Sequence, residues 1–228
     1  MMESEVKLFA KYCKENFSNE IEVFCTNEHY NSLPICILDC IYSLRAKYFK
    51  VTVPVVKRYA NRFMQGDMYS SNDTLADFIA RIEGYGECST FAREVLENNQ
   101  VLSGRNKTEV CLEIAKKLYE LLDINNLADF QQFKKEELLE LVLHSIKGVG
   151  DAGVNYLFML AGDPNRCKPD VHIHHCIKDA LGYTISNEEC QLLFRGTVDI
   201  LNETYPTLKV RDLDSVIWRI YQSGQNLN

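Results

Sequence analysis

The sequence predicts an all-α protein of about ten helices in two lobes with a cleft between them. Apolar residues recur every three or four positions along nearly all of the 228 residues, which is the spacing of one helix face. Short breaks rich in Gly, Pro or Asn separate these stretches, and no series of alternating strands is visible. The length suffices for one compact unit or for two small lobes that share a cleft.

The helical stretches differ in how they begin and in how apolar they are. Residues 33–48 are mostly apolar on all sides, which is typical of a central buried helix. Pro54 is expected in the first turn of the next helix, where its missing N–H has no partner in any case. Asn72 or Asp73 is expected to cap a helix, and Ser186 to Glu189 reads as a capping box. We expect helices over residues 4–17, 33–48, 54–64, 73–82, 91–96, 108–122, 134–145, 151–161, 186–205 and 212–221, and one that begins at Asp170.

Composition predicts a cytoplasmic location. No apolar run reaches the roughly 18–20 residues needed to cross a bilayer, and the acidic, amphipathic N-terminus does not have the pattern of a signal peptide. The nine cysteines are scattered singly, which favours reduced thiols over a secreted disulfide framework. We therefore expect a cytoplasmic monomer that does not bind membranes.

The distribution of charge leaves room for a nucleic-acid partner. The net charge is −7, and this counts against such a partner because nucleic-acid-binding domains are usually basic. A local basic face can nevertheless bind phosphate on an acidic protein. One short acid-free stretch contains six basic residues, namely Arg45, Lys47, Lys50, Lys57, Arg58 and Arg62.

A very short Gly-x-Gly turn joins the helix that ends near Ser145 to the next one. Glycine allows positive φ at Gly148 and Gly150 without a Cβ penalty. The amides of Val149, Gly150 and the following first turn are expected to point outward and to form an anion site at a positive helix end. An ordinary helix connection with a glycine stop explains the turn equally well, and Asp151 would repel a phosphate unless it points away.

Asp170 follows a proline and precedes an apolar helical stripe. Most aspartates in this context cap the helix and do nothing else. The positive end of the helix also favours the ionised carboxylate. An ionised carboxylate could stabilise an oxocarbenium-like sugar and orient or deprotonate an attacking water.

Together, Ile146-Lys147-Gly148-Val149-Gly150 and Asp170-Val171-His172-Ile173 resemble the motifs of the helix-hairpin-helix (HhH-GPD) DNA glycosylase superfamily, which includes endonuclease III and the alkyladenine glycosylases. The likeness is strong over residues 138–181 and loose elsewhere. It implies a single glycosylase-like unit over 1–228, with a helical barrel lobe at 33–162 that contains the hairpin at 138–161. The second lobe would combine 1–32 with 163–228.

The resemblance also implies roles for individual residues. Asp170 is expected to be catalytic, and a monovalent cation is expected at the hairpin when DNA binds. Arg45 or a neighbour would enter the gap left by a flipped base. The residues expected to contact double-stranded DNA are Lys147, Gly148, Val149, Gly150, Lys168, His172 and Arg45.

Departures from the family pattern narrow the expected chemistry. Ala152 stands where bifunctional members carry a lysine nucleophile, so we expect a monofunctional enzyme that uses water. Only Cys176 and Cys190 follow Asp170, so no iron–sulfur cluster is expected. Ile41 aligns loosely with the glutamate of the adenine-mismatch enzymes, which disfavours that subclass.

The three histidines after Asp170 raise the possibility of a metal site. His172 and His175 share a helix face, but His174 points elsewhere and no nearby cysteine completes a tetrahedral set. We expect structural or DNA-contacting histidines and no metal.

These observations predict a monofunctional DNA N-glycosylase that removes a damaged base, with alkylated purines expected first by analogy. One alternative is a non-catalytic DNA-binding protein that keeps the hairpin and has lost base excision. Another is a purely structural helical protein in which the glycine turn is coincidental.

Overall fold

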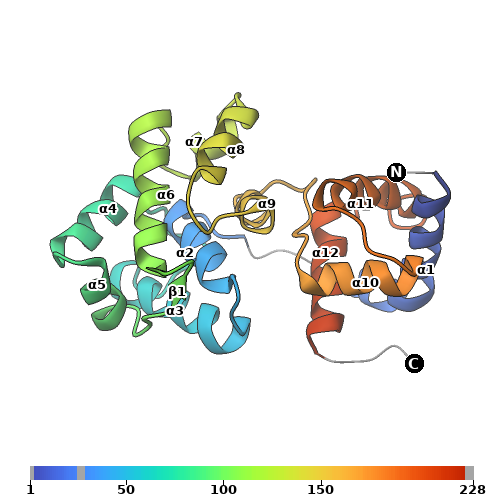
Figure 1. Ribbon diagram of the computed structural model, residues 1–228, viewed down its shortest axis with the longest axis horizontal. Helices are drawn as coiled ribbons and strands as arrows, with labels where there is room; N and C mark the ends of the chain where they lie inside the picture. Colours follow the sequence, from blue (N-terminus) through green and yellow to red (C-terminus); the bar gives the residue numbers. More distant parts are fainter. Residues whose placement is uncertain (1–2, 25–28, 224–228) are drawn as a thin grey trace. The chain divides into compact units, whose positions relative to one another are not determined.

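The computed structural model describes residues 3–24 and 29–223. In these ranges it contains twelve helices and a single pair of two-residue strands (Figure 1). The predicted all-α class is therefore confirmed. None of the described helices has the length and apolarity that crossing a membrane requires.

The chain forms two compact units, each with its own hydrophobic core. The continuous unit is Glu28–Gly162, and the discontinuous unit combines Met1–Asn27 with Asp163–Asn228. The elements of the continuous unit are α2 (Leu33–Ser43), α3 (Tyr48–Phe63), α4 (Leu75–Gly84), α5 (Cys88–Glu94), β1 (Val101–Leu102), β2 (Arg105–Asn106), α6 (Lys107–Leu122), α7 (Leu127–Gln132), α8 (Glu136–His144) and α9 (Asp151–Leu160).

Helix α2 is the centre of the continuous unit. All of its residues are buried, and it packs against α3, α4, α6 and α9 (Figure 1). The Ser32 side chain caps its N-terminus by accepting the Ile35 N–H at 3.3 Å. The expected central buried helix is thus confirmed, although it ends at Ser43 and not near residue 48.

Two details of the continuous unit differ from expectation. Pro54 does not begin α3 but lies inside it, because the helix already starts at Tyr48. The packing of Val55, Val56 and Tyr59 into the core offsets the backbone hydrogen bond that an interior proline removes. Thr74, and not Asn72 or Asp73, caps α4 by accepting the Asp77 N–H at 3.1 Å.

Asp73 is instead the centre of a buried polar cluster. Its carboxylate accepts the Tyr59 O–H at 2.5 Å and is paired with Arg81 at 2.7 Å. The guanidinium of Arg81 also lies 4.7 Å from the centre of the Phe63 ring. A buried carboxylate needs such partners because desolvation would otherwise be costly.

The discontinuous unit is a bundle of α1 (Glu3–Val23), α10 (Val171–Leu181), α11 (Asn187–Leu201) and α12 (Val210–Gln222). Helix α1 contacts the other three helices and buries the stripe Phe9, Cys13, Phe17 and Ile21. A Cβ at Gly196 would lie 2.9 Å from Val6 Cγ1, so this glycine permits the close approach of α1 and α11. The predicted capping box of α11, Ser186 with Glu189, is confirmed.

Candidate functional site

Asp170 lies at the N-terminus of α10 in the discontinuous unit. Its Oδ1 accepts the N–H of His172 at 2.9 Å and that of Ile173 at 3.2 Å, so the expected N-cap is confirmed. The side chain is half-buried, and its Oδ2 forms no hydrogen bond within the described ranges. One oxygen therefore fixes the carboxylate on the helix, while the other is available to a ligand.

The residues before Asp170 form a tight turn around Pro169. The Asp170 N–H donates to the Lys168 carbonyl at 2.7 Å, and the Lys168 N–H donates to Oδ2 of Asp214 at 2.8 Å. The Lys168 side chain, expected to contact DNA, is buried. Burial and the nearby charge of Asp170 raise the pKa of the Asp214 carboxyl well above its usual range.

The histidines of α10 contact different partners. The half-buried His172 ring meets the Trp218 ring edge-on, with centroids 6.3 Å apart. His174 Nε2 lies 2.9 Å from Asn187 Oδ1, and His175 is exposed. Within residues 3–24 and 29–223, no group of three or more His, Cys, Asp or Glu side chains is arranged to hold a metal ion.

The glycine turn lies between α8 and α9 of the continuous unit. Ile146 and Val149 are buried in its core, while Lys147 and Gly150 are exposed. Only Gly148 has a positive φ, of 100°; Gly150 is extended, with φ of −105°. The expectation of positive φ at both glycines is therefore wrong.

The amides of this turn are only partly available to an anion. Val149 N–H donates to the Ile146 carbonyl at 3.0 Å, so the expectation that it points outward is wrong. The amides of Gly150 and Ala152 donate to no acceptor in the part of the chain that the structure describes. These two N–H groups, at the start of α9, remain as candidate phosphate donors.

Gly148 and Gly150 form a matched pair for testing the turn. A Cβ at Gly148 would lie 3.0 Å from Leu102 Cγ and 3.1 Å from Ser103 Oγ, on a backbone that already has positive φ. We expect Gly148→Ala to lower the free energy of unfolding by about 1–3 kcal/mol. Gly150→Ala should change it by less than about 0.5 kcal/mol, because a Cβ there meets no atom within 4 Å.

Urea unfolding of both variants checks this expectation. Equal destabilisation by the two alanines would contradict the assignment of the conformational constraint to Gly148 alone.

A second segment of basic residues lies near the turn. Leu44 contacts the first turn of α9, because its Cδ1 is 3.5 Å from a Cβ built at Gly153. Arg45, the next residue, is exposed and adopts a left-handed backbone with φ of 55°. The exposed cations of this stretch that form no ion pair with any described residue are Arg45, Lys47, Lys50, Lys57 and Arg62.

The buried Lys107 holds this region in place. Its Nζ donates to the carbonyls of Tyr42 and Leu44 at 3.1 and 2.8 Å and to Oε1 of Gln100 at 3.0 Å. The side chain is 1% exposed, and burial lowers its pKa to about 8. Lys107 thus fixes the end of α2, immediately before Arg45, to the start of α6.

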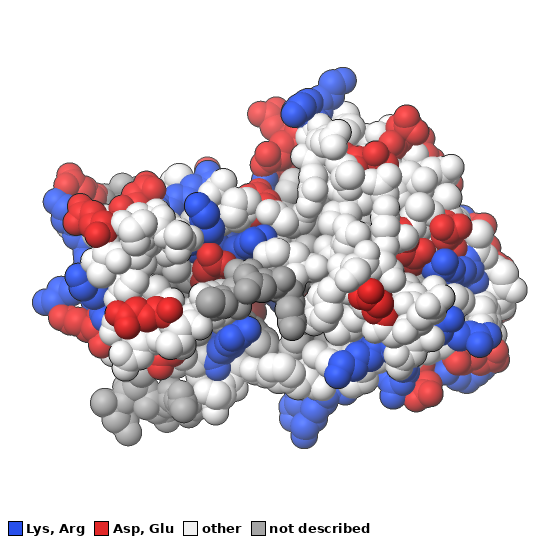
Figure 2. Space-filling model, turned by 180° about the vertical axis from the view of Figure 1, so that it is seen from behind, with Lys and Arg blue, Asp and Glu red and all other residues white. Residues whose placement is uncertain are grey.

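Charges of both signs are interspersed on the molecular surface. Figure 2 shows Lys and Arg beside Asp and Glu over one face, together with a broad area that has no charged side chain. The net charge of −7 therefore does not describe a uniformly acidic surface. Asp151 is exposed next to Gly150, and its Oδ1 is 3.7 Å from His144 Nε2.

A cluster around Asp39 was not anticipated from the sequence. This buried carboxylate in α2 accepts three tyrosine hydroxyls, from Tyr30 and Tyr48 at 2.8 Å and from Tyr156 at 2.9 Å. Burial, followed by the charge of Asp39, raises the pKa of all three phenols, so they stay protonated as donors. Ile41, which aligns loosely with the glutamate of the adenine-mismatch enzymes, lies two residues after Asp39 and is buried.

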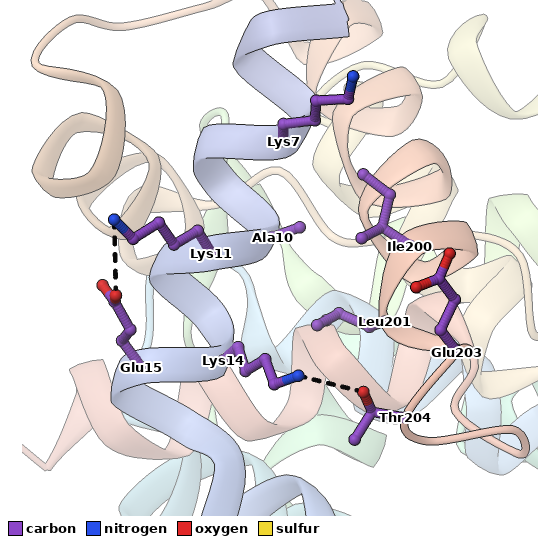
Figure 3. A pocket seen from close by; sticks show the side chains of 9 residues that line it. All are labelled: Lys7, Ala10, Lys11, Lys14, Glu15, Ile200, Leu201, Glu203 and Thr204. Atoms are coloured by element: carbon purple, nitrogen blue, oxygen red, sulfur yellow. Dashed lines mark hydrogen bonds and ion pairs between the residues drawn. The ribbon is translucent and has the colours of Figure 1, made fainter.

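A pocket of about 280 Å³ lies between α1 and the end of α11 (Figure 3). Three lysines line it, and each already has a partner: Lys7 pairs with Glu3, Lys11 with Glu15, and Lys14 donates to Thr204. None of the residues expected to act on DNA lines this pocket. We therefore do not assign the candidate chemistry to it.

Fold and site define an all-α protein of two units with a carboxylate fixed at a helix N-terminus. The chain belongs to a family described as a domain of unknown function (DUF8548), whose profile matches residues 7–223. No curated protein and no solved structure matches the chain.

Proposed function

We propose that the protein is a monofunctional DNA N-glycosylase of the helix-hairpin-helix type. The observation that carries the proposal is the state of Asp170: Oδ1 accepts two amides of α10, and Oδ2 is free within the described residues. In this proposal, α8 and α9 form the hairpin motif, and the two units are the two lobes of the glycosylase. It is supported by the order of the elements, because the turn precedes Asp170 by one helix and one loop.

The proposed reaction replaces the bond between a base and C1′ of its sugar. The base departs with the bonding electron pair, and the carboxylate of Asp170 stabilises the positive charge left on the sugar. A water oxygen then bonds to C1′, and Asp170 accepts the proton that the water loses. An alkylated purine suits this site best, because its positive charge lets it leave as a neutral base without a protein acid.

Two observations argue against a lysine nucleophile and so favour water. Ala152 occupies the position where a catalytic lysine would be expected. Lys107 has a lowered pKa, but it is buried and its Nζ is held by three oxygen acceptors. It is therefore not available to attack a sugar.

DNA binding is assigned to the continuous unit. The free amides of Gly150 and Ala152, with the exposed cations of residues 45–62, would contact phosphates. The Ile146 carbonyl accepts one N–H and keeps a second lone pair, so it could hold a monovalent cation against a phosphate.

The Gly150→Ala variant should bind duplex DNA more weakly than wild type without loss of stability, because the added Cβ would face the phosphate.

The test is incubation with duplexes that each contain one altered base: a methylated purine, uracil, hypoxanthine or 8-oxoguanine. We expect release of a free base and an abasic site that breaks only after alkali. Strand cleavage without alkali, with covalent trapping by borohydride, would show a bifunctional enzyme instead.

Asp151 favours a second candidate function, that of a DNA-binding protein without base excision. Its carboxylate is exposed beside Gly150 and would weaken phosphate contacts there. Salt-dependent duplex binding with no base released from any duplex would support this candidate.

A further inference from the structure

The segment that leads to Asp170 is attached to α11 and α12 at successive residues. Arg211 N–H donates to the Pro164 carbonyl at 3.2 Å, and Arg195 Nε donates to the Asn165 carbonyl at 3.2 Å. Gln191 contacts Cys167 twice: its Oε1 accepts the Cys167 N–H at 3.0 Å, and its Nε2 donates to the Cys167 carbonyl at 2.6 Å. This loop is therefore fixed from both helices.

Asp214 makes the attachment that is nearest to Asp170. Its carboxyl is 4% exposed and accepts the Lys168 N–H at 2.8 Å. The Lys168 carbonyl in turn accepts the Asp170 N–H at 2.7 Å. Two hydrogen bonds and one residue thus connect α12 to the backbone of Asp170.

The environment of Asp214 favours its neutral form. Burial and the negative charge of Asp170 raise its pKa, while the Lys168 N–H and ammonium act in the opposite direction. A neutral carboxyl can accept the Lys168 N–H without placing a second negative charge beside Asp170. Asparagine would keep both properties, since its side-chain oxygen accepts and it has no charge.

We propose that Asp214 is a positioning residue for Asp170, which it places by accepting the Lys168 N–H and so fixing the Lys168-Pro169-Asp170 turn. This inference rests on the proposed function. A displacement of about 1 Å at a reacting group can reduce a rate about 100-fold. Loss of the Asp214 acceptor should therefore act on the rate of base release and leave duplex affinity unchanged.

The experiment compares Asp214→Asn, Asp214→Leu and the control Asp199→Asn, which removes an exposed acid of α11. We expect Asp214→Asn and the control to keep the single-turnover rate within about threefold of wild type. Asp214→Leu, which keeps the size but not the acceptor, should lower this rate about 100-fold at unchanged Kd for the duplex. A wild-type rate in a folded Asp214→Leu variant would overturn the proposal.

Amide hydrogen exchange provides a readout that needs no activity. The Lys168 amide should be protected in wild type and in Asp214→Asn, and should exchange faster in Asp214→Leu. If the leucine variant does not fold, hydrogen exchange in the wild type alone tests the proposal. An unprotected Lys168 amide in the folded wild type would overturn it. If no duplex loses a base, the proposed function fails, while exchange still reports whether Asp214 fixes the turn.

Discussion

The Asp170→Asn variant should release base about 100- to 1000-fold more slowly than wild type, while it folds and binds duplex DNA normally. Asparagine is as good an N-cap as aspartate, and its side-chain oxygen can accept the same two amides, from His172 and Ile173. What the substitution removes is the negative charge on the free oxygen. Single-turnover base release, together with a binding titration, measures the two effects separately.

Two further variants separate the chemistry of Asp170 from its capping role. Asp170→Ala should lose base release and also about 1 kcal/mol of stability, because the cap is lost. Asp199→Asn, the exposed acid in the same unit, should change neither quantity. An Asp170→Asn variant with the wild-type rate would place the reaction elsewhere in the protein.

Lys107→Met should destabilise the continuous unit, by an amount that grows with pH. Methionine leaves two backbone carbonyls and the Gln100 side chain without their donor, at a cost of about 1–3 kcal/mol for each buried group left unsatisfied. Part of this is offset at neutral pH, since methionine does not carry the desolvation penalty of a buried ammonium.

The pH dependence follows from the lowered pKa of Lys107. The pKa is about 8 in the folded protein against 10.5 for an ordinary lysine. Below pH 8 both states carry the charge, and the penalty is fully present. Between pH 8 and 10.5 the folded lysine loses its proton while the unfolded one keeps it, so wild type gains stability relative to Lys107→Met.

The gain corresponds to about 3 kcal/mol over that interval. Urea unfolding of wild type and Lys107→Met from pH 7 to 10.5 measures it, because the titration of tyrosines and cysteines cancels in the difference. Lys57→Met, at an exposed position, should change the free energy of unfolding by less than about 0.5 kcal/mol. A constant difference between wild type and Lys107→Met would mean that the ammonium is not desolvated.

Local patterns predicted much of the fold. An apolar pattern on all sides identified α2 as the buried centre, and Ser186 with Glu189 identified the start of α11. Pro54 misled the prediction of α3, because a proline tolerated inside a helix looks the same in sequence as one that begins it. The short α7 was missed, although Asn126 and Asp129 form its capping box and could have indicated it.

Local patterns likewise identified only part of the candidate site. Asp170 could be selected because the turn and the cap are local patterns. Asp39 and Asp214 could not, because each has a partner that is distant in sequence: Tyr156 is 117 residues from Asp39, and Lys168 is 46 residues from Asp214. The inward hydrogen bond of Val149 depends on the turn type, which two glycines alone do not specify.

The discontinuous unit has a consequence for synthesis on the ribosome. Helix α1 precedes the continuous unit along the chain, but α10, α11 and α12, against which it packs, are made only after the whole continuous unit. The core of the continuous unit is formed only by residues of that unit. This unit can therefore fold while Phe9, Phe17 and Ile21 of α1 are still exposed. Helix α1 can therefore pack only after α10, α11 and α12 have been made. Until then its apolar face can bind chaperones or aggregate.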